Sequence, residues 1–236
     1  MNKKINDFLF FIAVFILYII YTAVIILFLN KIGIDINKFD EHTKNLYLII
    51  IDGSLMVITY LLYKKENNND LKKYANNFGK LFSTGLKLWL IGIALMITSN
   101  LIIHFLYPTA TATNEDAVQE MLKTAPIYTT FTACIFAPFM EEMVFRKSLQ
   151  KVFTSDILFI IFSGLLFGFA HIMGVSNMID MIYIIPYALF GCVFAYTYVK
   201  TNNIFVSITF HVIHNTILVA ISLLSIGVIK WNQDIN

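Results

Sequence analysis

The sequence predicts an all-α protein, a polytopic transmembrane helical bundle of about seven spans (six to eight) with its site in a membrane-embedded cavity. Residues of the AVILMFWYC set make up 58% of the 236 residues and charged residues 14%, against about 45–50% and about 25% in soluble domains. The mean hydropathy is +0.73. Twenty-two Phe and twelve Tyr exceed what a water-soluble core of this size can bury. These figures exclude a cytosolic globular protein and a disordered chain.

Seven apolar stretches could form spans, since a span needs about 20 mostly apolar residues. We expect the first to be a retained helix, because a cleavable signal peptide has a shorter apolar region and a small-residue cleavage site. No internal repeat divides the chain, so a single integral membrane domain is expected. The expected spans are residues 8–29, 46–63, 81–107, a fourth starting near Ile127, 157–173, 178–199 and 204–229.

Basic residues in the loops predict a multi-pass protein of the cell membrane with a cytoplasmic amino terminus and an external carboxyl terminus. Lysines crowd the segment after the second span, whereas residues 172–180 have no Lys or Arg. Residues 64–77, rich in Asn and Lys, are predicted to be a solvated loop, and residues 108–126 an outer loop framed by prolines. Pro138 and Pro186 fall inside spans four and six and should bend them.

The charge and the cysteines point to no further class of partner. The net charge is +2 and the lysines form no basic stripe, so no nucleic-acid partner is expected. Cys134 and Cys192 lie in apolar runs without a CxxC pattern, which is typical of small core residues. The sequence indicates no oligomeric state.

Three clusters of polar residues lie at or near membrane depth, where each ionisable side chain costs about 2.5–3.5 kcal/mol by insertion scales. They are residues 141–146 (EEMVFR) in span four, 167–171 (FGFAH) in span five and 211–215 (HVIHN) in span seven. Helical rise places Glu141 about 20 Å and His171 about 22 Å from the turn between spans four and five. All three clusters are therefore expected to meet at a similar depth.

Helical spacing separates the roles of the two glutamates. Glu142 and Arg146 stand at i and i+4 with the acid first, the favourable order for an ion pair. Glu141 is turned about 100° away from Glu142 and has no such partner. We therefore expect Arg146 to neutralise Glu142 and Glu141 to face a cavity, where a poorly solvated carboxylate beside another is suited to accept a proton.

The histidines and the asparagine are expected on the faces that meet this cavity. Gly164, Gly168 and His171 share one face of span five, and the small residues allow close helix contact. His211 and Asn215 share a face of span seven at i and i+4. This set suits hydrolysis of an amide, in which Glu141 activates a water and the other three orient it or stabilise the oxyanion.

Less specific interpretations exist for each feature. Glu plus two His is also a set of zinc ligands, but zinc is disfavoured because there is no HExxH and the ligands would come from three helices. Taken alone, the Glu142–Arg146 pair is more often structural than catalytic, and His171 alone would more often be an interhelical residue. His214 is expected to be interhelical, His104 interfacial and His42 solvated.

The three motifs together resemble those of the CAAX proteases and bacteriocin-processing enzymes, the CPBP or Abi proteins, which include type II CAAX prenyl endopeptidases. The resemblance covers about residues 125–220, within catalytic helices assigned to residues 121–230, while residues 1–120 carry N-terminal transmembrane helices without a recognised signature. It implies an intramembrane glutamic endopeptidase without a catalytic metal or other cofactor. The implied base is Glu141, with His171, His211 and Asn215 completing the site and Glu142 and Arg146 supporting it.

The resemblance also implies a class of substrate. Eukaryotic relatives cleave the last three residues from prenylated CAAX proteins, whereas a small protein rich in Asn, Lys and Ile looks bacterial. Expected partners are therefore membrane lipids and a peptide or protein with a membrane-associated cleavage site: a bacteriocin or signalling-peptide precursor, or a CAAX-like protein. One alternative is a catalytically inactive bacteriocin self-immunity or partner-binding protein on the same fold. Another is a proton-coupled carrier, which inverted repeats would favour, and none is found.

Overall fold

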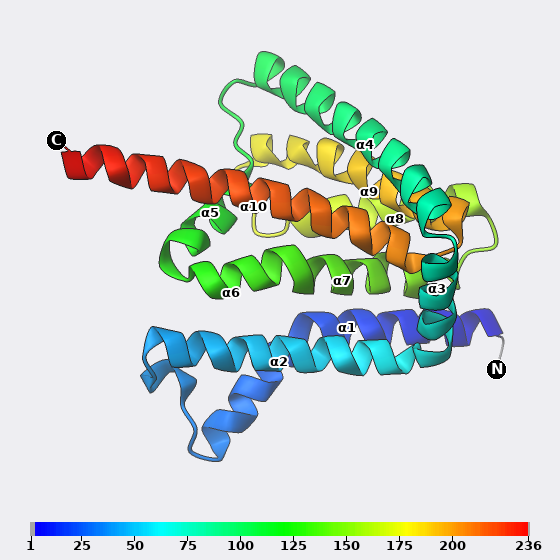
Figure 1. The fold of residues 1–236 in the computed structure, drawn as a ribbon, viewed down its shortest axis with the longest axis horizontal. Helices are drawn as coiled ribbons and strands as arrows, with labels where there is room; N and C mark the ends of the chain where they lie inside the picture. The colour runs from blue at the N-terminus through cyan, green and yellow to red at the C-terminus, as the bar shows by residue number, and fades with distance from the viewer. Residues whose placement is uncertain (1–2, 236) are drawn as a thin grey trace.

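The computed structural model describes the backbone of residues 3–235 and the side chains of residues 3–227. Within this part of the chain the secondary structure is helical, with no strand. Most helices run along one common direction, and α3 crosses their ends (Figure 1). The helices are α1 (Lys3–Lys31), η1 (Ile36–Lys38), α2 (Glu41–Leu62), α3 (Lys64–Asn76), α4 (Phe78–Leu106), α5 (Thr113–Thr124), α6 (Pro126–Phe131), η2 (Thr132–Phe136), α7 (Ala137–Glu142), η3 (Met143–Ser148), α8 (Asp156–His171), η4 (Met178–Tyr183), α9 (Ile184–Thr201) and α10 (Ile204–Ile235).

The prediction of an all-α polytopic membrane bundle is confirmed. Within the described residues, five helical segments are long and apolar enough to cross a membrane: α1, α2, α4, η4 with α9, and α10. They coincide with predicted spans one, two, three, six and seven. The fourth predicted span is a helical run from α6 to η3 that includes two π-helical segments, and the fifth is the 16-residue helix α8.

Local sequence signals set several helix ends. The Asp40 carboxylate accepts hydrogen bonds from the backbone amides of His42 and Thr43 at the start of α2. Ser155 caps α8 by accepting from the amide of Leu158. Asn202 ends α9 in the left-handed region, with φ 44°, a conformation that asparagine tolerates better than most residues.

The run from α6 to η3 contains two π-helical segments. Ala137 donates its amide to the carbonyl of Thr132, five residues back, directly before Pro138, which has no amide hydrogen to donate. A second π-helical segment, η3, follows Glu142 and ends where Leu149 donates to Val144. The predicted disturbance of span four at Pro138 is therefore present as a change of helical pitch, a feature frequent at functional sites.

Helices α8 and α9 pack closely against each other, a close helix contact of the kind that the small residues of span five predicted. A Cβ added to Gly164 would lie 2.7 Å from the carbonyl oxygen of Ala188 and would overlap the sulfur of Cys192. A Cβ added to Gly168 would lie 2.9 Å from the carbonyl oxygen of Ile184. Glycine is thus needed for α9 to approach α8 at this distance. Both cysteines are free thiols, Cys134 buried and Cys192 half-buried.

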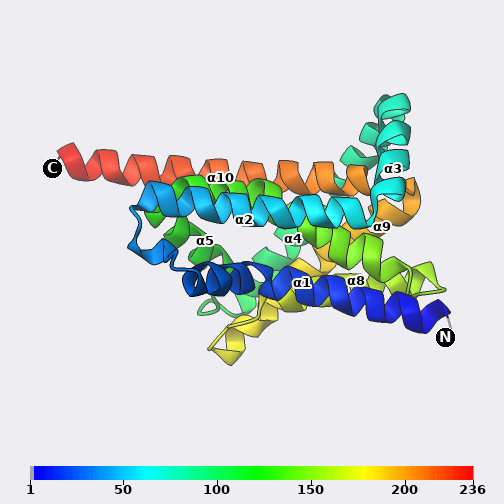
Figure 2. The same cartoon turned by 90° about the horizontal axis from the view of Figure 1, so that it is seen from below.

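Residues 64–77 form a helix, so the prediction of a solvated loop was wrong. Helix α3 lies across one end of the bundle, roughly perpendicular to the long helices (Figures 1 and 2). Glu66 pairs with Lys151 at 2.8 Å and Asp70 with Lys147 at 2.7 Å, while Lys73 donates to the carbonyl of Thr201 at 3.0 Å. These long-range contacts stabilise a polar helix that has no apolar pattern of its own.

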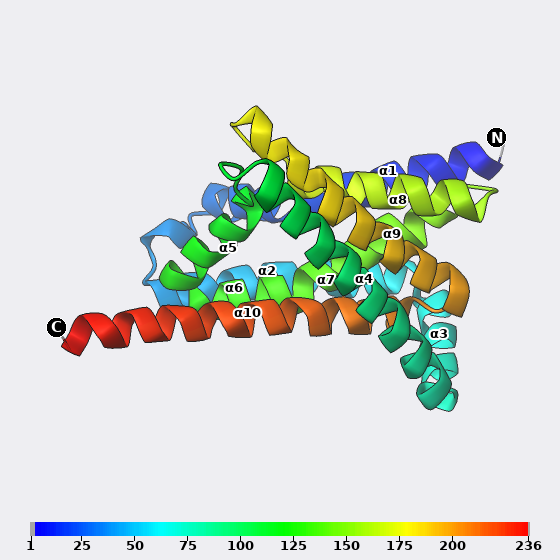
Figure 3. The same cartoon turned by 90° about the horizontal axis from the view of Figure 1, so that it is seen from above.

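The segment 108–126 also contains a helix where an outer loop was predicted. Helix α5 buries Leu122 against Cys134 and Val219. Ahead of it, Asp180 accepts hydrogen bonds from the amide and hydroxyl of Thr111. Figure 3 shows α5 beside α10, away from the end that α3 crosses.

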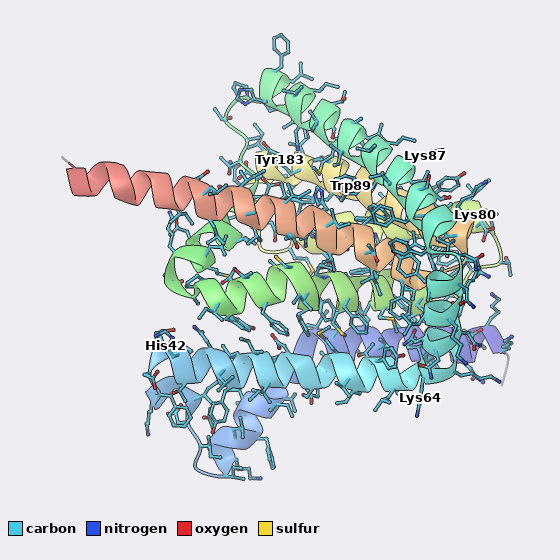
Figure 4. The ribbon with its side chains drawn as sticks, in the orientation of Figure 1. His42, Lys64, Lys80, Lys87, Trp89 and Tyr183 are labelled. Carbon is cyan, nitrogen blue, oxygen red and sulfur yellow. The ribbon has the colours of Figure 1, made fainter. Side chains whose placement is uncertain are left out.

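The two ends of the bundle differ in charge. Lys64 and Lys80 lie at the end crossed by α3, where the described chain begins, and His42 lies at the opposite end (Figure 4). This grouping of lysines is the one from which a cytoplasmic amino terminus was predicted. The orientation itself stays a prediction.

Replacing Gly164 by Ala should destabilise the protein by about 1–3 kcal/mol, because the new methyl group meets the α9 backbone, which cannot move aside freely. Gly53→Ala is the matched control: this glycine also lies within a predicted span, and an added Cβ there has no neighbour within 4 Å. The stabilities of the two variants are compared by their thermal unfolding midpoints in detergent. Equal midpoints for the two variants would contradict the close-packing role of Gly164.

Candidate active site

The predicted site residues come from two consecutive parts of the helical run, α7 and η3, and from two later helices, α8 and α10. Glu141 and Glu142 end α7, and Arg146 lies in the π-helical segment η3. His171 is the last residue of α8, and His211 and Asn215 lie in α10. Helix α10 packs against both α7 and η3, which brings these residues together.

Glu142 is completely buried and has three polar partners. Its carboxylate lies 3.3 Å from the Nε of Arg146, accepts a hydrogen bond of 2.5 Å from Ser207 and lies 3.0 Å from the Nδ1 of His211. The predicted ion pair with Arg146 is thus present. The contacts with Ser207 and His211 were not predicted from the helical spacing.

Arg146 is also completely buried. Besides Glu142 it donates to the carbonyl oxygen of Gly191 at 3.1 Å. Its guanidinium carbon lies 4.6 Å from the centroid of the Phe167 ring and 5.7 Å from that of Phe194, so the charge contacts two aromatic faces. The first residue of the FxxxH motif therefore contacts the last residue of the EExxFR motif.

Glu141 points in a different direction from Glu142, as their angular separation on the helix predicted. Its side chain is 12% exposed and lies 3.7 Å from the Nε2 of His211. The hydroxyl of Tyr18 in α1 donates to it at 3.5 Å. The distance to His211 is too long for a direct hydrogen bond, so the two groups face each other across a narrow gap.

His211 lies between the two glutamates. Its ring stacks on Phe194 at a centroid distance of 4.7 Å and meets the edge of Phe167 at 5.7 Å. An ionised Glu142 can only accept hydrogen bonds. The Nδ1 of His211 is therefore the protonated nitrogen, and it donates to the Glu142 carboxylate. A neutral His211 then presents the lone pair of Nε2 toward Glu141.

His171 is fixed by its own helix and by an aromatic neighbour. Its Nδ1 lies 2.8 Å from the carbonyl oxygen of Phe167, and a carbonyl only accepts, so Nδ1 is the donor. The ring stacks on Tyr187 of α9, with centroids 4.7 Å apart and planes at 27°. Its Nε2 remains for contacts outside its own helix.

Asn215 and His214 complete the α10 side. Asn215 donates through Nδ2 to the carbonyl oxygen of Ala133 at 2.8 Å, within the π-helical segment η2. His214 is buried with its ring centroid 4.3 Å from that of Phe190, which agrees with the interhelical position expected for it. His42 and His104 are exposed.

Two cavities adjoin these residues and share His171 and Asn114 in their walls. The first cavity, about 370 Å³, is bordered by Glu141 and by apolar side chains of α1 and η3. The second cavity, about 290 Å³, is bordered by His211, His214 and Asn215. All four residues assigned to the site from the sequence therefore line one or both cavities.

The sequence-based assignment missed several residues that contact the site. Ser207 precedes His211 by one helical turn, so its position on the same face was available as a signal. Tyr18 and Tyr187 contact Glu141 and His171 from α1 and α9, and no local pattern marks either of them. Their roles depend on how the helices are arranged in space.

A metal ion needs several donor side chains that converge on one point. Among the residues that the structure describes, no group of three or more His, Cys, Asp or Glu side chains is arranged to hold one. His211 uses Nδ1 for Glu142, and Glu142 is already occupied by Arg146 and Ser207.

Comparisons with known proteins match the part of the chain that holds this site. The family described as Rce1-like, type II CAAX prenyl endopeptidase, matches residues 123–217. The UPF0177 protein YvdC of Lactococcus lactis is 26% identical over 138 residues, which cover 57% of this chain and 52% of that protein. The match thus spans about half the length of the Lactococcus protein.

A second relative covers more of the chain. YdiL of Bacillus subtilis, whose name describes it as a candidate membrane peptidase, is 24% identical over 192 residues, covering 77% of this chain and 73% of that protein. No solved structure shows a significant match. Residues 123–217, which the family model matches, include all three motifs and every residue of the site assigned from the sequence. Residues 123–217 of this multi-pass membrane protein are therefore similar to the Rce1-like, type II CAAX prenyl endopeptidase family, and the relatives add a likeness to membrane peptidases.

Proposed function

We propose that this membrane protein is a glutamic endopeptidase that hydrolyses a peptide bond with a water activated by Glu141. One observation carries the proposal: of two adjacent carboxylates, Glu142 is fully buried and occupied by partners, whereas Glu141 borders a cavity opposite His211. Only Glu141 is thus placed to contact a molecule that enters. The match to a peptidase family supports the same reaction class.

In the proposed reaction Glu141 accepts a proton from water while the water oxygen attacks the carbonyl carbon of the substrate. The carbonyl π electrons move to its oxygen and form a tetrahedral oxyanion. When the C–N bond breaks, Glu141 returns its proton to the leaving nitrogen. The products are a carboxylic acid and an amine, so one water is consumed and Glu141 is regenerated.

Three further side chains have distinct proposed tasks. The Nε2 lone pair of His211 accepts a hydrogen bond from the attacking water and holds it beside Glu141, across the 3.7 Å gap. The amide of Asn215 keeps one N–H after donating to Ala133, and this N–H is available to the oxyanion. The Nε2 of His171, in the wall between the two cavities, is available to the substrate amide.

Glu142 and Arg146 act in this proposal as positioning residues. By accepting from Nδ1, Glu142 fixes the tautomer of His211 that leaves Nε2 free to accept. Arg146 stabilises the ionised form of Glu142 at 3.3 Å. Neither contacts the cavities, so both act through His211.

The proposed substrate is a bacterial peptide precursor, such as a bacteriocin or signalling peptide, or a CAAX-like protein. Both relatives found by comparison come from bacteria. The wall of the first cavity includes Phe15, Ile19, Phe145 and Met173, which suits an apolar segment that leaves the lipid phase. With a cytoplasmic amino terminus, the end crossed by α3 faces the cytoplasm.

Glu141→Gln should lower the rate of peptide cleavage by about 10²–10⁴-fold, because an amide cannot accept the proton of the water. The assay follows precursor peptides in lipid vesicles by mass spectrometry, with protein amounts equalised. Glu120→Gln is the control, since Glu120 is exposed, pairs with Lys123 and borders neither cavity. Full activity of Glu141→Gln would refute the assignment of Glu141 as the base.

Cleavage should persist when the purified protein is treated with EDTA and assayed in the chelator. The reason is that Glu142 pairs with His211 and Arg146, and among the described residues the acid and imidazole groups are not grouped as metal ligands. Initial rates with and without EDTA provide the measurement. Loss of activity that zinc restores would overturn a metal-independent reaction.

Arg146→Met should destabilise the protein by about 3–5 kcal/mol, because it leaves the Glu142 charge buried without its cation. Adding Glu142→Gln to Arg146→Met should recover part of this loss. Unfolding midpoints of the two single variants and the double variant give the coupling between the sites. Simple additivity would show that the ion pair does not support the site.

A further inference from the structure

The second cavity has a wall that the proposed mechanism does not use. Helix α5 contributes Asn114, Glu115, Val118 and Gln119 to this wall. His171, His211 and Asn215 line the same cavity. Glu115 is thus a carboxylate that shares a cavity with the candidate catalytic residues without belonging to any of the three motifs.

A short chain of contacts joins Glu115 to the site. The hydroxyl of Tyr187 donates to the Glu115 carboxylate at 3.4 Å. The ring of the same tyrosine stacks on His171 at a centroid distance of 4.7 Å. A group bound to Glu115 would therefore lie next to the aromatic residue that contacts His171.

The charge of Glu115 is not balanced by a neighbouring cation. Among the side chains of residues 3–227, none of the ion pairs includes Glu115; Lys123, also on α5, pairs with Glu120 at 2.6 Å. The next residue, Asp116, adds a second negative charge. Desolvation by the surrounding atoms, followed by Asp116, raises the pKa of the Glu115 carboxyl despite the hydrogen bond from Tyr187.

A carboxylate in such a place is stabilised by any cation that enters the cavity. Glu115 is exposed, so water moderates its attraction to a cation, and a substrate group can supply the charge that the protein lacks. An anionic group at the same position would meet Glu115 and Asp116 and be repelled. The arrangement therefore discriminates by charge, which a purely apolar cavity does not.

We propose that Glu115 determines specificity by binding a positively charged group of the substrate, a Lys or Arg side chain or a free amino group, close to the bond that is cleaved. This inference rests on the proposed function and names a property of its substrate. The first cavity then receives the apolar part of the peptide and the second cavity its basic part. A substrate with an acidic residue at that position is disfavoured.

The test uses three synthetic peptides in lipid vesicles that share one apolar membrane-anchoring segment. They differ only at one position beside the mapped cleavage site, which is Lys, Gln or Glu. The unmodified protein should show a kcat/KM at least about fivefold higher for the Lys peptide than for the Glu peptide. Glu115→Lys should reverse this order, and Glu115→Gln should reduce the ratio toward one.

Asp116→Asn is the matched control, because it removes the same charge from the neighbouring residue, which borders neither cavity. It should keep the preference for the Lys peptide. If Glu115→Lys cleaves the three peptides in the same order as the unmodified protein, the proposal is wrong. Glu115→Gln provides the same comparison if Glu115→Lys does not fold.

A binding measurement separates this proposal from the proposed function. Fluorescein-labelled forms of the three peptides are titrated against Glu141→Gln, and against Glu141→Gln combined with Glu115→Lys, by fluorescence anisotropy. Tighter binding of the Lys peptide, reversed in the combined variant, supports the role of Glu115 even if no peptide is cleaved. Equal affinities for the Lys, Gln and Glu peptides would refute that role, whether or not cleavage occurs.

Discussion

The buried cluster of Glu142, Arg146, Ser207 and His211 is the interaction on which the rest of the site depends. A carboxylate and a guanidinium without contact to water are stable only when they are paired, and here Glu142 and Arg146 are both fully buried and lie 3.3 Å apart. Here the partners come from η3, α9 and α10, so the charges fix how three helices meet. Because Glu142 is held in this way, the neighbouring Glu141, turned about 100° around the helix, borders the first cavity.

Much of this arrangement could be predicted from the sequence because it depends on helical periodicity. The i, i+4 spacing gives the Glu142–Arg146 pair, and the 100° step separates Glu141 from Glu142. Gly164 and Gly168, one turn apart, indicate a close helix contact, and in the structure the partner is α9. In each case the relevant geometry lies within one helix, where residue number determines direction.

The contacts between helices could not be predicted in this way. Nothing near Tyr18 marks it as a neighbour of Glu141, because the two residues are 123 positions apart. Helix α3 was missed for a related reason: its Glu66 and Asp70 are paired with lysines of another segment, so its stability does not depend on an apolar face. Polar segments between spans are thus poorly predicted when tertiary ion pairs hold them.

The π-helical turn after Glu142 has a consequence for how the motif tolerates change in length. Within this turn, the carbonyl oxygen of Phe145 accepts a hydrogen bond of 2.7 Å from the hydroxyl of Ser163 in α8. The π-helical turn is thus bonded to a second helix. Such a turn corresponds to one residue more than a regular helix needs. Loss of that residue would rotate everything beyond it by about 100°, carrying Arg146 away from its acid. The number of residues between Glu141 and Arg146 is therefore constrained as strictly as the identities of these two residues.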